Sequence, residues 1–445
     1  MIEKLAISNF RSIDKMVVID FSMNNVKYNK EYSKLITKCK DEKISRVNFF
    51  YGKNGAGKST IIHALKYLKS LALESNYEPE SSYFMFKYNV PKITPFKLLN
   101  KIKEESFLSI TYCINDNKYR YSVTYNNKES LISDERLEVY IYDSYELVYS
   151  KINKIYNDFT EVELERLKTY KIDFVSILSI VNEKINVSSP SLKVYLNDSF
   201  LFFKNLSFSF DSFDDDESLN YLLNNKTYLN KIIKEVKKFD ISIDDIKIDR
   251  REINYEEYFK LFEDIVVNSN NERDKQIIEY IKNRYESEKY EFKLEFIHNK
   301  KSLSFNDESD GTINILNILF SLIASQKSIW VIDDFENYLH TEAVLELIKY
   351  ISKGFNSKQF LLVTHELDIL DLNEVKFKPV HFFVEKDKLL LSTNIVNLSD
   401  FKDLRVDERN SWKKFYQNYR LGQYPEITIS NNITNEMEDN KDANQ

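Results

Sequence analysis

Residues 52–59 read GKNGAGKS, which fits the G-x-x-x-x-G-K-[ST] pattern of a loop that binds nucleotide phosphates. In such a loop, backbone N–H groups and the positive end of the following helix dipole surround the phosphates. The ammonium of Lys58 would reach the β- and γ-phosphates, and the hydroxyl of Ser59 would hold Mg²⁺. The predicted nucleotide-binding residues of this loop are Gly52, Asn54, Gly55, Ala56, Gly57, Lys58, Ser59 and Thr60.

The surroundings of this loop support the same role. Residues 46–51 are apolar enough for a buried strand, and apolar residues after the loop recur at helical spacing. The chain has 6 glycines among 445 residues, and three of them lie at positions 52, 55 and 57. Because average proteins contain about 7% glycine, we expect each retained glycine to serve a backbone purpose. The sequence therefore predicts a strand, a tight loop and a helix start in this order.

Candidate catalytic carboxylates follow the apolar run at residues 329–332, which predicts a second buried strand. Asp333 ends this strand, where a carboxylate can hold Mg²⁺ through water. Asp334 comes next, in the position of a general base for the attacking water, and Glu336 is the next candidate for that role. We therefore assign Ser59 and Asp333 to the metal, and Asp334 and Glu336 to catalysis.

A third apolar strand is predicted at residues 359–363, and it leads into Thr364 and His365. An imidazole at the end of such a strand can form hydrogen bonds with the γ-phosphate and with the attacking water. His365 is therefore the third catalytic candidate. The other four histidines of the chain lack a comparable position.

Residues 309–312 read SDGT and precede an apolar helix predicted at residues 313–325. A serine at the helix start, with a nearby glycine, leaves free N–H groups at the positive end of the helix dipole. Ser309 and Gly311 therefore form a candidate anion site. In an ABC-type enzyme such a site would contact the γ-phosphate held by a second subunit.

The order of these motifs along the chain resembles that of ABC-type ATPases, the class that also contains SMC-like and RecF-like enzymes. This resemblance implies ATP and Mg²⁺ as ligands and an ATP-sandwich homodimer or higher homo-oligomer. The chain departs from the pattern at three points. Asp334 replaces the usual catalytic glutamate, and SDGT replaces the usual signature, SGGQ. The glutamine of the ABC Q-loop is missing, because no glutamine occurs before Gln276.

Further patterns resemble OLD-like ATPases and the AAA ATPases of abortive-infection systems. Two lie at residues 5–13 (LAISNFRSI) and 333–340 (DDFENYLH), and others at residues 383–387 (FVEKD), 398–401 (LSDF), Arg405 and 419–425 (YRLGQYP). They imply the sensor or switch ATPase of a bacterial anti-phage system, which controls a separately encoded, nuclease-like effector.

The expected fold is α/β: a P-loop ABC-type ATPase fold with an antiparallel β-subdomain and a largely helical insertion. Residues 1–144 would carry the phosphate loop and the β-subdomain, and residues 145–290 the helical insertion or lid. Residues 291–429 would complete the ATPase domain, and residues 430–445 are polar enough to predict a disordered tail.

Composition limits the other function classes. No apolar run approaches the roughly 18 residues of a membrane span, and the N-terminus lacks a signal-peptide pattern. Because two cysteines cannot build a disulfide framework, we expect a cytoplasmic protein. Because no apolar run is long enough to span a membrane, we expect no membrane partner. The net charge of −7 does not indicate nucleic-acid binding, although a local basic groove stays possible.

Two alternative functions stay open. One is a RecF-like or SMC-like DNA-maintenance ATPase, and the other is a nucleotide-gated scaffold with very slow turnover. The segment around Glu385 resembles the start of a TOPRIM nuclease, but no later D-x-D pair follows it. The sequence therefore predicts that the chain has no nuclease site of its own.

Overall fold

The computed structural model describes residues 1–24, 26–39, 42–74, 93–98, 101–170, 172–210, 216–252, 290–387, 389–401 and 411–417. The predicted disordered tail and the end of the expected helical insertion, residues 253–289, lie outside the described residues. Within them, no helix is long and apolar enough to cross a membrane.

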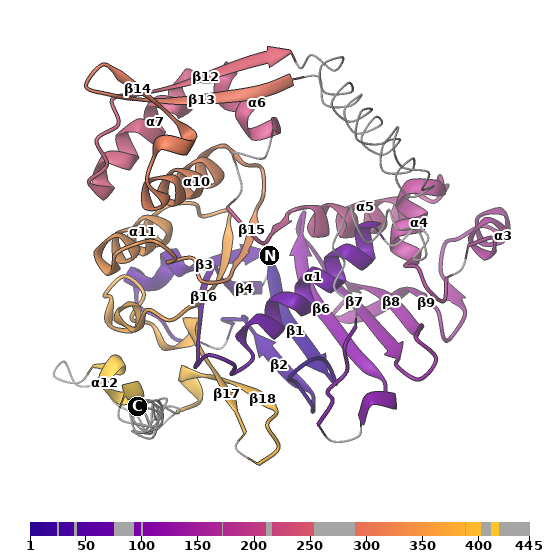
Figure 1. Ribbon diagram of the computed structural model, residues 1–445. Helices are drawn as coiled ribbons and strands as arrows, with labels where there is room; N and C mark the ends of the chain where they lie inside the picture. The colour runs from indigo at the N-terminus through magenta and orange to yellow at the C-terminus, as the bar shows by residue number, and fades with distance from the viewer. Residues whose placement is uncertain are drawn as a thin grey trace, which may run out of the picture.

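A six-stranded sheet carries the predicted nucleotide motifs (Figure 1). Its order is β11-β15-β16-β5-β17-β18, and all neighbours except β17 and β18 run parallel. The strands are β5 (Val47–Tyr51), β11 (Leu206–Ser207), β15 (Ile329–Ile332), β16 (Gln359–Thr364), β17 (His381–Lys386) and β18 (Thr393–Asn397). Because the carboxyl ends of parallel strands share one edge, the residues that follow β5, β15 and β16 come together.

Helices connect these parallel strands, as their crossover connections require. The main ones are α1 (Lys58–Glu74), α10 (Asp310–Ala324) and α11 (Thr341–Lys353), while α12 (Trp412–Gln417) lies near the end of the described chain. Helix α11 packs Val344, Leu347 and Ile348 into the same hydrophobic cluster as the apolar side chains of β5 and β16. The predicted strands and the helices after the phosphate loop and after Ser309 are thus confirmed.

A second, seven-stranded antiparallel sheet has the order β10-β9-β8-β7-β6-β1-β2. Its strands are β1 (Ile2–Ser8), β2 (Val17–Asp20), β6 (Ser106–Ile114), β7 (Asn117–Asn126), β8 (Leu131–Ile141), β9 (Ser144–Ser150) and β10 (Ile155–Tyr156). One hydrophobic cluster contains apolar residues of α1 and of both sheets. Gln359 also joins the sheets, because its buried amide accepts from Ile2 N at 2.6 Å and donates to Ser45 O at 2.9 Å.

The segment that we expected to be largely helical, residues 145–290, has a mixed structure in its described part. It contains α3 (Glu161–Lys168), α4 (Ile177–Lys184), α5 (Pro190–Lys204), α6 (Asp216–Asn224) and α7 (Lys226–Val236). It also contains most of β9, and β12 (Asp245–Glu252), which pairs with β13 (Tyr290–His298) and through it with β14 (Lys301–Ser304). The expected limits at residues 144/145 and 290/291 therefore fall inside strands.

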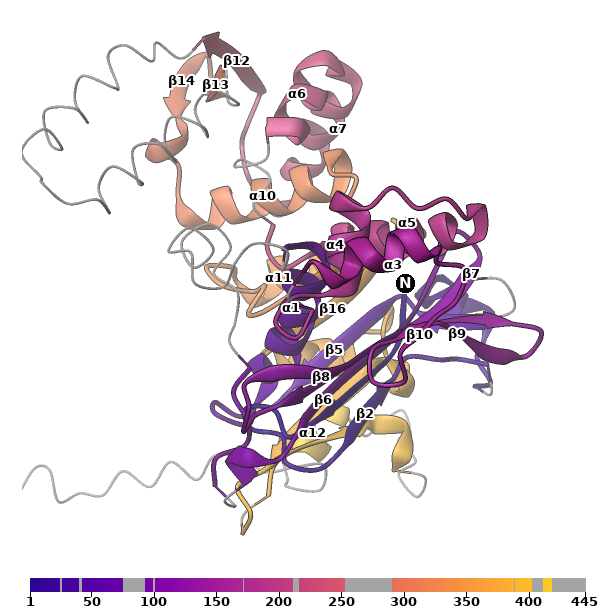
Figure 2. The same ribbon diagram turned by 90° about the vertical axis from the view of Figure 1, so that its right-hand side faces the viewer.

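The helices of this segment form two groups that pack in different places (Figures 1 and 2). Helices α4 and α5 pack on α1, beside the antiparallel sheet. Helices α6 and α7 pack on α10 together with β12. Each predicted functional helix, α1 and α10, thus has its own helical support.

The remaining described elements are short. The hairpin of β3 (Ile36–Cys39) and β4 (Glu42–Ser45) is followed directly by β5. The 3₁₀ helices are η1 (Lys30–Leu35), η2 (Lys101–Lys103), η4 (Lys237–Phe239), η5 (Phe305–Asp307), η6 (Leu367–Asp371), η7 (Lys378–Val380) and η8 (Leu398–Asp400).

Candidate nucleotide-binding site

A cavity of about 500 Å³ lies at the carboxyl edge of the parallel sheet. Predicted site residues from the phosphate loop and from the ends of β15 and β16 line it together. They are Asn54, Gly55, Gly57, Lys58, Ser59, Thr60, Asp333, Asp334 and His365. Its volume is in the range of pockets that hold small organic ligands, about 300–1,000 Å³.

The glycines of the phosphate loop are required by its backbone and its neighbours. Gly55 and Gly57 have φ angles of +77° and +109°, a region that residues with a side chain rarely adopt. A Cβ atom on Gly57 would lie 2.1 Å from Thr393 Oγ1, and one on Gly52 would lie 2.5 Å from the carbonyl oxygen of Val384. Gly52 and Gly57 therefore allow β17 and β18 to approach the loop closely, whereas Gly55 is required by its φ angle alone.

Lys58 is the buried cation of the loop. Its Nζ donates to the carbonyl oxygens of Gly52 at 2.8 Å and Lys53 at 3.2 Å. Burial lowers the pKa of Lys58, while the carboxylates of Asp334 and Asp333 oppose that shift. The ammonium is thus held over the loop by carbonyl groups that phosphate oxygens could replace.

The side chains of Ser59 and Asp333 both line the cavity and contact each other, which is the arrangement that a shared metal requires. Ser59 Oγ donates to Asp333 Oδ2 at 2.9 Å. Hydroxyl and carboxylate oxygens are ligand types that Mg²⁺ uses, and this ion keeps several waters and substrate phosphates as its other ligands. No group of three or more His, Cys, Asp or Glu side chains in the described residues could hold a metal ion. The Ser59–Asp333 pair fits an Mg²⁺ ion whose other ligands are waters and phosphate oxygens.

Asp334 and His365 face each other beside this pair. Asp334 has a φ of +47°, and its backbone N–H donates to the carbonyl oxygen of Val363 at 3.1 Å. Its buried Oδ1 makes no hydrogen bond and lies 3.6 Å from His365 Nε2. A carboxylate oxygen held without a donor, next to an imidazole, is available to accept a proton from water.

Glu336 does not line the cavity, in contrast to the other two catalytic candidates. Its Oε1 accepts a hydrogen bond from Thr364 Oγ1 at 2.9 Å and from the backbone N–H of His365 at 2.6 Å. The carboxylate thus ties the loop after β15 to the end of β16. This geometry favours a positioning role for Glu336 rather than contact with water.

The start of α10 also lies outside the cavity of its own chain. Ser309 caps the helix, and its Oγ accepts from the backbone N–H of Thr312 at 3.2 Å. A Cβ atom on Gly311 would lie 3.0 Å from the carbonyl oxygen of Tyr338. Neither Ser309 nor Gly311 lines the cavity that contains the phosphate loop.

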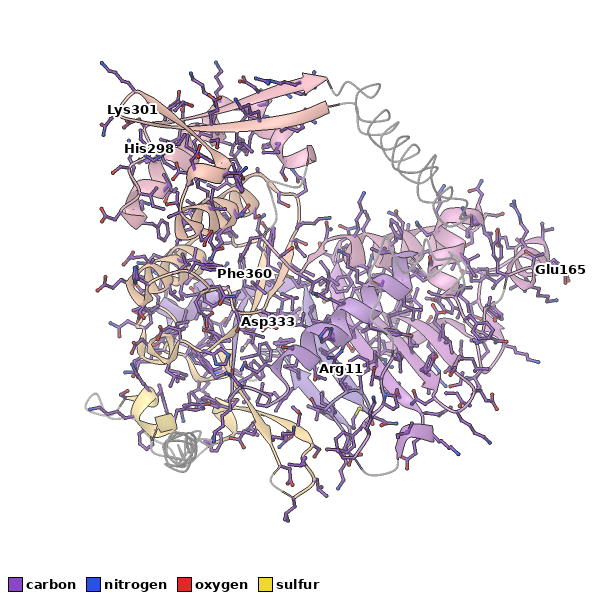
Figure 3. All side chains as sticks on the ribbon, in the orientation of Figure 1. Arg11, Glu165, His298, Lys301, Asp333 and Phe360 are labelled. Atoms are coloured by element: carbon purple, nitrogen blue, oxygen red, sulfur yellow. The ribbon has the colours of Figure 1, made fainter. Side chains whose placement is uncertain are left out.

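Several cavity residues were absent from the predicted site. Arg11, Ser12, Lys53, residues 94–98, Lys386 and Leu391 complete the lining. Figure 3 places Arg11 and Asp333 in the middle of the molecule, away from Glu165 and His298. Arg11 and Ser12, and likewise Lys386, lie in patterns that indicate a family, whereas residues 94–98 and Leu391 lie in no pattern that indicates a ligand.

Hydrogen bonds explain how these distant segments meet at the loop. Ser12 Oγ lies 2.8 Å from Thr60 Oγ1 and accepts from Thr393 Oγ1 at 2.8 Å. The backbone N–H of Arg11 donates to the carbonyl oxygen of Thr94 at 2.6 Å. As a result, the segment after β1 joins the phosphate loop to β18 and to residues 94–98.

Comparisons with known proteins identify similar solved structures and one matching family model. No curated protein matches the chain in sequence. Similar solved structures include an SMC head domain from Thermotoga maritima, with a TM-score of 0.39 and 13% identity over 91% of this chain and 99% of that one. Others are an SMC head bound to the C-terminal winged-helix domain of ScpA and an SMC head with an extended coiled coil, bound to the C-terminal domain of ScpA, from Pyrococcus furiosus. The first of these two has a TM-score of 0.42 and 14% identity, over 91% of this chain and 99% of that one. The second has a TM-score of 0.35 and 16% identity, over 94% of this chain and 99% of that one.

A family model described as "AAA domain, putative AbiEii toxin, Type IV TA system" matches residues 47–371. The match begins at β5, directly before the phosphate loop, and ends after the strand that carries His365. It spans more than half of the 445 residues. The chain therefore belongs to this family of P-loop AAA-domain proteins.

Proposed function

We propose that the chain binds Mg-ATP and hydrolyses it at sites shared between two copies. The observation that carries the proposal is the convergence of the phosphate loop, the Ser59–Asp333 pair and Asp334 in one cavity. Five cationic side chains line that cavity, namely Arg11, Lys53, Lys58, Lys97 and Lys386. They outnumber its two carboxylates, Asp333 and Asp334. This charge surplus suits a triphosphate with its metal ion.

The residues would divide the work as follows. Lys58 and the loop N–H groups bind the phosphates, and Ser59 and Asp333 hold Mg²⁺, which neutralises charge that develops on the phosphate oxygens. Asp334 takes the proton of the attacking water, and His365 hydrogen-bonds the γ-phosphate. Glu336 keeps the His365 backbone in place through its hydrogen bond.

The proposal of a homodimer is supported by the position of α10. Its N-terminal end is suited to an anion but lies outside the cavity of its own chain. A second copy placed head to tail would bring its Ser309 and Gly311 to the γ-phosphate. Such a two-fold arrangement is closed and uses the same surface on both copies.

The biological setting that we infer is anti-phage defence, in which the ATPase switches a separately encoded effector. Support comes from the patterns that resemble abortive-infection ATPases and from the family description, which names a putative toxin of a type IV system. Co-expression of the chain with its neighbouring gene should protect cells from phage, and Lys58→Ala should abolish the protection. Protection by the chain alone would contradict the separate effector.

The ATP site is tested directly with purified protein. Lys58→Ala should weaken ATP binding about tenfold to a hundredfold or more, because charge-assisted contacts with the phosphates are lost. Nucleotide binding by fluorescence and phosphate release are the measurements, with Lys66→Ala on the same helix but outside the cavity as the matched control. Unchanged binding in Lys58→Ala would contradict the site, and binding without phosphate release in the parent would favour the scaffold alternative.

A further inference from the structure

The turn between β17 and β18, at the bottom of Figure 1, carries three consecutive leucines that are exposed to solvent. Leu389, Leu390 and Leu391, which we call the leucine turn, are 92%, 38% and 45% exposed. Single exposed apolar residues are common on protein surfaces, but a contiguous exposed group at a loop tip marks an interaction site.

The backbone of the leucine turn is held by hydrogen bonds. Asp387 Oδ1 accepts from the backbone N–H groups of Leu389 at 2.8 Å and Leu390 at 2.6 Å, and the Asp387 carbonyl accepts from Leu391 at 2.9 Å. The N–H groups of Leu390 and Leu389 lower the pKa of Asp387. The leucines are thus displayed on an ordered tip.

Leu391 also has an unfavourable backbone conformation. Its φ is +54°, in the left-handed region where glycine and asparagine are the favoured residues. Among the non-glycine residues with positive φ in the described part of the chain, Leu391 is the only one with an aliphatic side chain. Both its exposure and its conformation disfavour leucine in the isolated chain, so the reason for this side chain lies outside the monomer.

The leucine turn borders the nucleotide cavity. Leu391 and Lys386 line that cavity, and so does Leu98, which is 58% exposed. A molecule that covers these leucines therefore also covers the mouth of the nucleotide site.

A complementary surface lies next to the nucleotide cavity of the same chain, and Asp333 and Asp334 line both. A cavity of about 350 Å³ lies beside the start of α10, and we call it the α10 cavity. Phe208, Phe335 and Tyr338 contribute apolar surface to it, together with Ile313 of α10. Asp310, at the first position of α10, adds an acidic group that would face Lys97 and Lys386 of another copy.

We propose that the leucine turn of one copy docks into the α10 cavity of a second copy when ATP closes the dimer. The proposal rests on the shared ATP site: the arrangement that brings Ser309 and Gly311 to the partner's nucleotide also brings the α10 cavity toward the leucine turn at its mouth. Two-fold symmetry then makes the contact twice, and each turn is covered.

Substitutions at the tip test this contact against a closed dimer trapped by Asp334→Asn. Leu389→Glu should leave ATP binding to the monomer unchanged at protein concentrations too low for dimerisation, since Leu389 does not line the nucleotide cavity. It should weaken ATP-dependent dimerisation at least tenfold in sedimentation experiments. Val162→Glu is the matched control, because Val162 is 73% exposed on α3 and lies outside both cavities. Leu391→Asn should weaken dimerisation while keeping or raising the thermal stability of the nucleotide-free protein.

Crosslinking tests where the turn docks. The native Cys39 and Cys113 are 7% and 2% exposed, so a bismaleimide will act on introduced thiols. Leu389→Cys in one subunit and Ile313→Cys in the other should give a covalent dimer with ATP and none without it. If the dimer forms equally well with Leu389→Glu and no crosslink appears, the docking is overturned while the shared ATP site stands. If ATP induces no dimer in the Asp334→Asn parent, both are overturned.

Discussion

At the scale of single residues, the arrangement after β15 separates two carboxylates that are two positions apart in the sequence. Asp334 turns into the nucleotide cavity through a left-handed backbone conformation, and its Oδ1 keeps no hydrogen-bond partner. Glu336 turns away and holds Thr364 and His365. Glu336 Oε2 also has no hydrogen-bond partner, so the difference between the two carboxylates is that only Asp334 lines the cavity. A free carboxylate oxygen in the cavity is what a residue that handles a proton would show.

We therefore predict different outcomes for two conservative changes. Asp334→Asn should keep ATP binding and lower phosphate release about 10²- to 10⁴-fold, because general base catalysis is lost. Glu336→Gln should have a smaller effect, since its amide oxygen can still accept from the His365 N–H. Single-turnover phosphate release and equilibrium ATP binding are the measurements. Wild-type turnover in Asp334→Asn would transfer the role of base to Glu336.

At the scale of elements, a buried carboxylate attaches helix α4 to the antiparallel sheet. Glu135, on β8, is fully buried and accepts hydrogen bonds from Tyr121 OH at 3.0 Å and Tyr149 OH at 2.9 Å. It also accepts from Ser176 Oγ at 2.7 Å and from the Ile177 backbone N–H at 2.8 Å, at the start of α4. With the Leu178 backbone N–H at 3.3 Å, five donors and the helix dipole thus compensate the buried charge.

Removing this carboxylate should destabilise the fold. Glu135→Ala should lower the free energy of unfolding by about 2–5 kcal/mol, because buried donors lose their acceptor and a cavity forms. Glu146→Ala, an exposed glutamate on β9, is the control and should change it by less than about 0.5 kcal/mol. Chemical denaturation followed by circular dichroism measures both. Equal stability of the two variants would show that α4 is held by apolar packing alone.

At the scale of the whole molecule, the phosphate loop and the start of α10 line two adjoining cavities, which share Asp333 and Asp334. The phosphate loop lies in one, whereas Asp310, next to Ser309 and Gly311, lies in the other. Each part has its own helical support, α4 and α5 behind α1, and α6 and α7 behind α10. This separation is what a site assembled from two copies needs.

Mixing two inactive variants tests the assembly. Lys58→Ala removes the loop cation, and Gly311→Asp adds a side chain whose Cβ lies 3.0 Å from the Tyr338 carbonyl oxygen and places a negative charge at the helix start. In an equal mixture, half of the dimers contain both variants and one intact site, so about a quarter of the wild-type phosphate release should return if the sites act independently. Each variant alone is the control. Full activity of Gly311→Asp alone would contradict the role of α10.

The sequence by itself determined the parts of the site that depend on contiguous residues. The loop at residues 52–59, the strands before Asp333 and His365, and the helix start at Ser309 are encoded by neighbours a few positions apart, since backbone conformation and strand burial are local preferences. The predicted class of P-loop ATPases agrees with the AAA-domain family model that matches residues 47–371, whereas the resemblance to OLD-like ATPases stays a prediction.

Tertiary structure alone decided which other side chains surround the loop. Ser12 and Thr393 are 381 positions apart and meet against Gly57. Leu391 lines the cavity from the β17–β18 hairpin, at a position outside every pattern found in the sequence. The orientation of Glu336 away from the cavity likewise depends on Thr364, which sits on the neighbouring strand. Such contacts arise from how sheets and helices pack, and packing brings together residues that share no spacing in the sequence.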